Sequence, residues 1–354
     1  MTNTSDLRKE GFSFLATGIG SVPTLDVGRT CLDILAHLPQ MPFWPQFPRR
    51  AHLEDMTLQF TGGLPLIEVD EQGRRPVLSS GERASELALF YEHFLAEDEE
   101  HFALSRQYAP GLHELIALVR EEPARYGPYL KGQTIGPVTF CMAVLDHEGK
   151  AIIHDPEMVE AISRGLAIKA LWQARQLAAC GKEPFLFLDE PSLTGFGSAF
   201  SSIQRDEVIR LLREFMGYLR ERCPVRIGIH CCGNTDWSMI TEARPDIISF
   251  DAFSYMDYFL LYREEILQFL RRGGSIAWGI VPTGEEIHHA SPEDLLRKLT
   301  QGLDRLIEWG LDRDTVRQHS LLTPACGMGG MEEASAASAL DLLRDLSGTC
   351  TREW

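Results

Sequence analysis

The chain has 354 residues, a formal net charge of −17, and 44% apolar and 24% charged residues, which is typical of a globular protein. The negative charge argues against nucleic acid and anionic membranes as main partners, because both repel an acidic surface. No apolar run is long enough to span a bilayer, and the polar N-terminus lacks a signal-peptide pattern. We therefore expect a cytoplasmic protein, in which eight sparse cysteines stay reduced.

The first part of the chain predicts an irregular series of elements. Residues 1–11 precede the first strand and predict a flexible tail. The elements that follow are, in chain order, a strand at 14–21, a helix at 25–38 with Asp26 as its N-cap, a short second strand within the proline- and aromatic-rich residues 41–50, a hairpin at 64–77 with its turn at 71–73, and a helical stretch at 80–108.

From residue 129 onward, short apolar strands alternate with amphipathic helices, which predicts a parallel sheet covered on both faces. With the first strand and the irregular second one, the strands approach eight. No Gly-x-Gly-x-x-Gly fingerprint follows the first strand, so a closed barrel fits better than an open sheet. We predict strands at 129–133, 185–188, 225–229, 247–250, 274–281 and 319–323, and helices at 156–180, 206–222, 264–272, 292–310 and 332–346.

The predicted fold is α/β: a single (β/α)8 TIM barrel over residues 1–354, with the hairpin as an N-terminal insertion and residues 347–354 as a C-terminal tail. The active site of such a barrel lies at the carboxyl ends of its strands. Polar side chains and potential metal ligands recur at these predicted ends, whereas the predicted strand starts show no such pattern.

The strand at 225–229 ends in a histidine and two cysteines. Residues two apart on a strand face the same side, so His230 and Cys232 point one way and Cys231 the other. Cys326 follows the last strand and would reach the same edge of the barrel. Imidazole and thiolate are zinc ligands, and three protein ligands with an exchangeable fourth position are typical of a catalytic Zn2+ site. The alternative is that His230, Cys232 and Cys326 are all core residues.

Asp251 ends the strand at 247–250 and has two interpretations: a displaceable fourth zinc ligand, or an acceptor that orients His230. Two thiolates and a neutral imidazole leave zinc without net charge. Such a centre removes the proton of a substrate thiol and keeps its sulfur nucleophilic. The predicted site therefore suits attack by sulfur on a methyl group better than the activation of water.

Two further strand ends carry candidate substrate contacts. Asp189 and Glu190 precede a proline, so either carboxylate is a substrate contact or a cap of the following helix. We favour a site role for Asp189. Ser21 and the backbone around Gly20 form a turn that suits a substrate carboxylate, although a Gly-Ser turn alone is a weak signal.

Five motifs occur in an order that resembles the catalytic barrel of cobalamin-independent methionine synthase. More broadly, they resemble the superfamily that joins this enzyme with uroporphyrinogen decarboxylase and the corrinoid-dependent zinc methyltransferases. The His-x-Cys with a distant cysteine is the specific part. The motifs are Ile19-Gly20-Ser21, Gly136-Pro137-Val138-Thr139, Asp189-Glu190-Pro191, His230-x-Cys232 and Pro324-Ala325-Cys326-Gly327.

The resemblance implies a zinc-dependent methyltransferase that moves a methyl group to a small thiol, homocysteine most of all, as in methionine biosynthesis. It implies that His230, Cys232 and Cys326 hold Zn2+, that Ile19 to Ser21 cradle the amino-acid end of the thiol, and that Asp189 meets its ammonium group. The alternatives are methyl transfer from a corrinoid to another thiol, such as coenzyme M, and a metal-free decarboxylase of the uroporphyrinogen type.

Two departures from the family bear on these expectations. The length leaves no room for the additional N-terminal barrel of the full synthase, so the chain resembles the short, core-only synthases. For these, a methylated corrinoid protein is a plausible methyl donor in place of methyl-folate. Asp251 also stands where the family has a zinc-binding glutamate, and the missing methylene weakens its case as a ligand.

Overall fold

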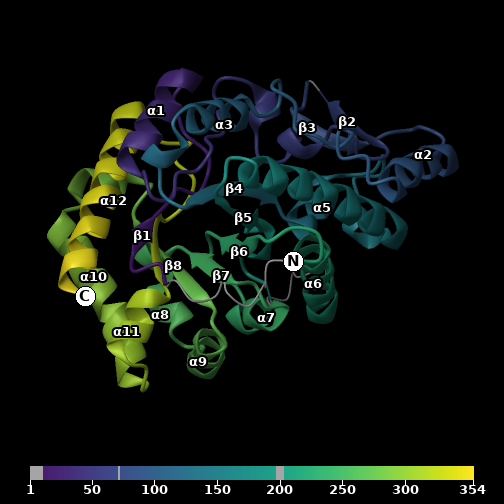
Figure 1. Ribbon diagram of the computed structural model, residues 1–354. Helices are drawn as coiled ribbons and strands as arrows, with labels where there is room; N and C mark the ends of the chain where they lie inside the picture. Colours follow the sequence, from purple (N-terminus) through teal and green to yellow (C-terminus); the bar gives the residue numbers. More distant parts are fainter. Residues whose placement is uncertain (1–10, 71, 197–202) are drawn as a thin grey trace.

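Seven parallel strands form a curled sheet at the centre of the computed structural model, which describes residues 11–70, 72–196 and 203–354. The strands lie in the order β1-β9-β8-β7-β6-β5-β4 (Figure 1). Their bounds are β1 (Leu15–Ala16), β4 (Tyr129–Ile135), β5 (Glu183–Asp189), β6 (Arg226–Cys231), β7 (Ile247–Phe250), β8 (Ser275–Val281) and β9 (Ser320–Pro324).

The proline- and aromatic-rich segment closes this sheet into a barrel. Phe43 forms a parallel bridge with Lys131 of β4, and Gln46 forms one with Ser21, which follows β1. The amide of Gln46 donates to the Gly20 carbonyl at 3.0 Å, and the amide of Trp44 donates to the Lys131 carbonyl at 3.3 Å. The segment therefore occupies the eighth strand position between β1 and β4, as the sequence predicts for a (β/α)8 barrel.

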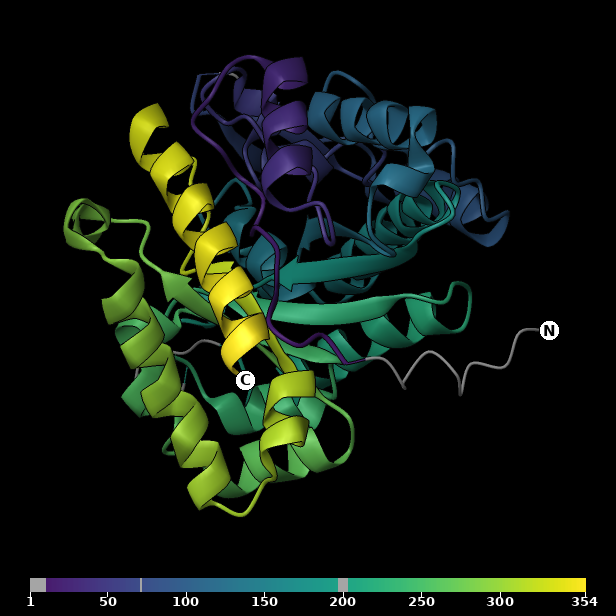
Figure 2. The same cartoon turned by 60° about the vertical axis from the view of Figure 1, so that its left-hand side comes forward.

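Helices cover the outer face of the barrel (Figures 1 and 2). A large apolar cluster fills the space between sheet and helices. A smaller cluster that includes Tyr129, Phe185 and Leu321 fills the lower barrel interior, toward the amino ends of the strands. Among the described residues, no helix is both long and apolar enough to cross a membrane. The helices are α1 (Val27–His37), α2 (Arg83–Leu95), α3 (Pro110–Glu121), α4 (Pro137–Ala143), α5 (Pro156–Ala178), α6 (Arg205–Arg220), α7 (Trp237–Ala243), α8 (Ala252–Phe259), α9 (Arg263–Arg271), α10 (Pro292–Glu308), α11 (Arg313–Gln318) and α12 (Glu333–Glu353).

The inserted hairpin consists of β2 (Ile67–Asp70) and β3 (Arg75–Leu78), which pair antiparallel. Asp70 accepts hydrogen bonds from the amides of Gln72 and Gly73, so its carboxylate organises the turn. Glu71 of the predicted turn and residues 1–10 of the predicted tail lie outside the described residues. The hairpin and α2 lie together to one side of the barrel (Figure 1).

Two predictions at the level of elements are wrong. The stretch 80–108 is helical only in α2, because Glu97 adopts a positive φ of 51° that ends the helical path. Residues 347–354 are not a free tail, since α12 continues to Glu353. Ser347 donates to the Phe14 carbonyl at 2.7 Å, and Cys350 is fully buried. Packing against the start of the barrel therefore overrides the weak helix propensity of this Ser-, Gly- and Thr-rich segment.

Candidate metal centre

Three potential metal ligands converge at the carboxyl ends of the barrel strands. His230 lies in β6, Cys232 follows the last residue of β6, and Cys326 lies just beyond β9. One ligand atom from each, the imidazole nitrogen or the thiol sulfur, lies within 4.8 Å of the other two. The structure thus brings together the three residues that the sequence selected. One nitrogen and two sulfur atoms are a donor set that zinc accepts in tetrahedral sites.

Strand alternation explains which side chains reach the centre. In the parallel register, His230 lies beside Asp189 of β5 and Ser249 of β7, and all three side chains are buried. Cys231 faces away, where its thiol donates to the Gly233 carbonyl at 3.5 Å, and it is fully buried. Cys231 is therefore a packed core residue, and Cys232 is the one that reaches the centre.

The imidazole of His230 is held in an orientation that suits metal binding. Its Nδ1 lies 2.9 Å from the hydroxyl oxygen of Ser249. Its Nε2 is buried and has no hydrogen-bond partner among the residues that the structure describes. A buried polar atom without a partner is costly, and ligation of a metal would satisfy it. With Nε2 as the ligand, Nδ1 carries the proton and donates it to Ser249, the usual arrangement for a histidine ligand.

The thiols of Cys232 and Cys326 differ in how readily they lose a proton. The neighbouring thiol of Cys326 and the imidazole of His230 lower the pKa of the Cys232 thiol to about 4. The neighbouring Cys232 sulfur in turn raises the pKa of Cys326, and burial adds to that effect. A second thiolate therefore forms here only if a cation arrives to balance it. A divalent ion does this, so the residues fit a zinc ion.

Asp251 is not among the three grouped ligands. It lies close enough to Cys232 and His230 to interact with both electrostatically, and burial raises its pKa. Its Oδ1 accepts a hydrogen bond from the amide of Ser254 at 2.7 Å, which caps α8. Ser249 pairs with Nδ1 of His230 and so takes the orienting role suggested for Asp251, whereas the role of Asp251 as a fourth ligand stays a prediction.

Glu190 also has a role other than the expected substrate contact. It is fully buried, and it accepts hydrogen bonds from Val138 N at 3.1 Å, Thr139 N at 2.7 Å and Thr139 Oγ1 at 2.6 Å. Gly136 leaves room for this carboxylate, because a Cβ there would lie 2.1 Å from Oε1. Glu190 therefore caps α4, the helix after the neighbouring strand, and not the segment that follows it in the chain.

Asp189 ends β5 inside the barrel, where only 7% of it is exposed. Its Oδ1 is buried without a hydrogen-bond partner among the described residues, and burial raises the pKa of Asp189. Opposing this shift is Lys131 of β4, whose ammonium group interacts electrostatically with the carboxylate. The free oxygen remains available to a hydrogen-bond donor from a ligand, in keeping with the site role expected for Asp189.

Lys131 belongs to the site, and sequence reasoning missed it. It is fully buried, and its Nζ donates to the carbonyl of Ile19 and, at 3.0 Å, to Oε1 of Gln133. Burial lowers its pKa. The available signal was its position in an otherwise buried strand, since a lysine is almost never fully buried without a partner.

The turn at Ile19, Gly20 and Ser21 lies against the loop that carries Cys326. The amide of Met328 donates to the Ser21 carbonyl at 2.9 Å, and the amide of Gly329 donates to its hydroxyl at 3.2 Å. The structure therefore brings this predicted substrate-binding turn to the edge that holds the candidate ligands.

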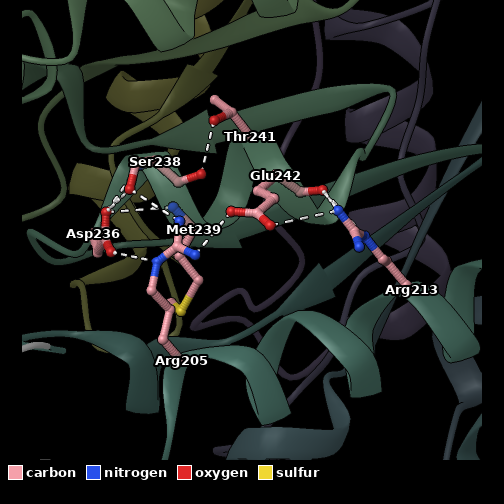
Figure 3. Close-up of polar contacts among 7 residues, drawn as sticks. All are labelled: Arg205, Arg213, Asp236, Ser238, Met239, Thr241 and Glu242. Carbon is pink, nitrogen blue, oxygen red and sulfur yellow. Dashed lines mark hydrogen bonds and ion pairs between the residues drawn. The ribbon is translucent and has the colours of Figure 1, made fainter.

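An ion-pair network fixes the segment after Cys232 (Figure 3). Asp236 caps α7 and lies 3.3 Å from the guanidinium of Arg205, which also pairs with Glu242 at 2.8 Å. Arg213 donates to the carbonyl of Glu242 at 2.7 Å. These contacts tie α6 to both ends of α7, so they anchor the loop that extends from Cys232 to the helix.

Comparisons with known proteins bear on the fold. No protein-family model matches the chain, and no curated protein sequence matches it. Among solved structures, the chain is similar to a B12-independent methionine synthase from Shewanella sp. W3-18-1 in complex with selenomethionine, with 14% identity, a TM-score of 0.56, and coverage of 96% of this chain and 98% of that one. A GH113 beta-mannanase from Alicyclobacillus acidocaldarius aligns over the same shares at 11% identity and a TM-score of 0.40. The likeness to the synthase supports a TIM-barrel fold.

Proposed function

We propose that this protein is a zinc-dependent methyltransferase that transfers a methyl group to the sulfur of a small thiol, homocysteine in the first instance, to give methionine. The observation that carries the proposal is the convergence of ligand atoms of His230, Cys232 and Cys326 within 4.8 Å, with the Nε2 of His230 buried and without a hydrogen-bond partner in the described part of the chain. Zinc would be held by these three residues, which leaves one position open for a substrate.

Each residue has a defined part in this proposal. When bound, zinc would supply a Lewis acid that lowers the pKa of a substrate thiol at neutral pH. Ser249 keeps the imidazole of His230 in the tautomer whose Nε2 is a ligand. The low pKa of Cys232 provides one thiolate before any metal arrives. The site therefore needs to release one proton, from Cys326, when it takes up the ion.

Homocysteine is the substrate that the remaining groups suit best. The turn from Ile19 to Ser21 would receive its amino-acid end, and the unpartnered Oδ1 of Asp189 would accept a hydrogen bond from its ammonium group. The likeness to a methionine synthase that binds selenomethionine supports the same assignment. The methyl donor in this proposal is a methylated corrinoid protein or methyl-folate.

Metal analysis of the purified protein tests the centre. We expect about one zinc ion per chain in the wild type, almost none in Cys326→Ser, and an unchanged content in Cys231→Ser, because the Cys231 thiol faces away from the centre. Equal zinc in all three proteins would show that Cys326 is not a ligand. A wild type without zinc would favour the metal-free decarboxylase.

Activity assays then address the substrate. Wild-type protein is incubated with L-homocysteine or coenzyme M as the thiol, and with methylcobalamin or methyl-folate as the donor, and methylated products are measured by mass spectrometry. Methionine formation that disappears in Cys326→Ser but persists in Cys231→Ser would support the proposal. Methylation of coenzyme M alone would reassign the thiol and leave the centre intact.

A further inference from the structure

Lys131 is a charged side chain in the barrel interior, where apolar residues normally fill the space. Its Nζ donates to the carbonyl of Ile19, in the turn after β1, and to Oε1 of Gln133 on its own strand. It also lies 4.9 Å from the centre of the Phe187 ring. A buried ammonium group costs several kcal/mol unless its hydrogen bonds and counter-charge compensate it. The presence of Lys131 inside the barrel therefore calls for an explanation.

The contacts of Lys131 point to the turn at Ile19, Gly20 and Ser21. This turn is held from three sides: Gln46 N donates to Gly20, Met328 N donates to Ser21, and Lys131 binds Ile19 from within the barrel. The first two hydrogen bonds are donated by neutral backbone amides, whereas the third is donated by the Lys131 side chain and is the stronger type when that group is protonated.

Lys131 also balances the charge of Asp189. The two side chains interact electrostatically within the barrel, and Oδ1 of Asp189 has no hydrogen-bond partner among the described residues. Lys131 therefore supports Asp189 without occupying that oxygen. The two groups that would meet the amino-acid end of a thiol, the turn and Asp189, are thus both set by one ammonium group.

We propose that Lys131 is a positioning residue that holds the turn at Ile19 to Ser21 and the carboxylate of Asp189 in place for a zwitterionic amino-acid thiol. This inference rests on the proposed function and deepens it, because it names the class of thiol that the site prefers. A thiol without ammonium and carboxylate groups gains nothing from Lys131.

The chain offers a matched control in Lys169 of α5. This lysine is also buried, and its Nζ also donates to a backbone carbonyl, that of Phe102, at 3.1 Å. Burial lowers the pKa of both ammonium groups. Phe102 lies between α2 and α3 and not at the strand ends that carry the candidate site. Lys169→Met therefore reproduces the loss of a buried ammonium group at a distance from the site.

The first measurement compares two thiols by calorimetry on zinc-loaded protein. We expect Lys131→Met to weaken the binding of L-homocysteine by about tenfold or more, the effect of losing one charge-assisted hydrogen bond. Binding of 2-mercaptoethanol should stay within about twofold, and Lys169→Met should change neither. Unchanged homocysteine binding in Lys131→Met, or an equal loss for both thiols, would overturn the proposal. Should Lys131→Met not fold, Lys131→Gln replaces it, with the same expectation.

The second measurement is hydrogen exchange, which needs neither zinc nor substrate. The amides of Val22, Gln46 and Met328 form the hydrogen bonds that surround the turn. We expect them to exchange faster in Lys131→Met than in Lys169→Met. Equal exchange in both variants would overturn the positioning role. A wild type that binds neither zinc nor thiol would refute the proposed function separately, and hydrogen exchange would still decide the role of Lys131.

Discussion

Replacement of Ser249 by alanine tests whether the imidazole of His230 is a metal ligand. The hydroxyl of Ser249 lies 2.9 Å from Nδ1 of His230, and both side chains are buried at 0% and 3% exposure. At these exposures bulk water has little access to replace the lost acceptor. The variant therefore leaves the N–H of the ligating imidazole without a partner and frees the ring to rotate.

The expected loss follows from the role of that hydrogen bond. Removal of the group that orients a metal-bound histidine lowers metal affinity by about 10- to 100-fold. This loss corresponds to about 1.4–2.7 kcal/mol of binding free energy. The affinity for zinc is measured by competition with a chromophoric chelator at fixed pH and ionic strength.

Ser275 provides the control for this experiment. Its hydroxyl lies 3.1 Å from Nδ1 of His319, so Ser275→Ala also removes a serine–histidine hydrogen bond. Ser275 begins β8, at the opposite end of the barrel from the candidate centre. We expect its zinc affinity to remain within about twofold of the wild type. The reasoning is refuted if Ser249→Ala keeps wild-type affinity, or if both variants lose the same amount.

Three further predictions concern the strand ends. Glu190→Ala should lower the free energy of unfolding in urea by about 2–4 kcal/mol, because two amides and a hydroxyl lose their buried acceptor. The control is Glu293→Ala at the exposed start of α10, which should lower it by less than about 1 kcal/mol. Similar losses in the two variants would contradict the capping role of Glu190. Gly20→Ala should destabilise the protein by about 1–3 kcal/mol, because the new Cβ would lie 2.5 Å from Oε1 of Gln46. Gly217→Ala in α6 should stabilise the protein by up to about 1 kcal/mol, because the space around this glycine is open and alanine favours a helix. In chelator-treated protein, iodoacetamide should alkylate Cys232 at pH 6 faster than it alkylates a free thiol. The lowered pKa keeps Cys232 ionised at this pH, whereas an ordinary thiol of pKa about 8.5 is mostly protonated. An alkylation rate that rises about tenfold per pH unit from pH 6 to 8 would contradict the lowered pKa.

The parts of the fold that could be predicted from the sequence are those set by local pattern. Alternation along β6 separates His230 and Cys232 from Cys231, and it requires no knowledge of neighbours. The regular succession of strands and helices predicts a barrel whose strand ends share one edge, and this edge brings Cys326 to the pair. Three ligands from distant segments thus follow from pattern and fold class together.

The parts that could not be predicted depend on register between strands. Ser249 meets His230 because β6 and β7 pair with these residues side by side. Glu190 caps α4 because β4 and β5 are neighbours and end at the same level. In the sequence, the proline after Glu190 points instead to the next turn. The sequence analysis also missed five helices: α3, α4, α7, α8 and α11. Four of them have only six to eight residues, too few to show a clear periodicity, whereas α3 has 12 residues and was missed despite its length.

The distribution of apolar and polar groups inside the barrel points to a functional site at the carboxyl ends of the strands. Its lower part is apolar, with Phe185 and Leu321 in one cluster. Two residues further along β9, on the same face as Leu321, Thr323 is fully buried, and its hydroxyl has no hydrogen-bond partner in the part of the chain that the structure describes. Within the described ranges, Asp189 Oδ1 and His230 Nε2 also lack hydrogen-bond partners at this edge of the barrel. Unpartnered polar atoms lower stability when nothing binds them, so a core selected for stability alone would replace them with apolar groups. These three atoms belong to residues at the carboxyl ends of β5, β6 and β9, the edge that carries the three ligands, where a metal and a polar substrate would supply the missing partners.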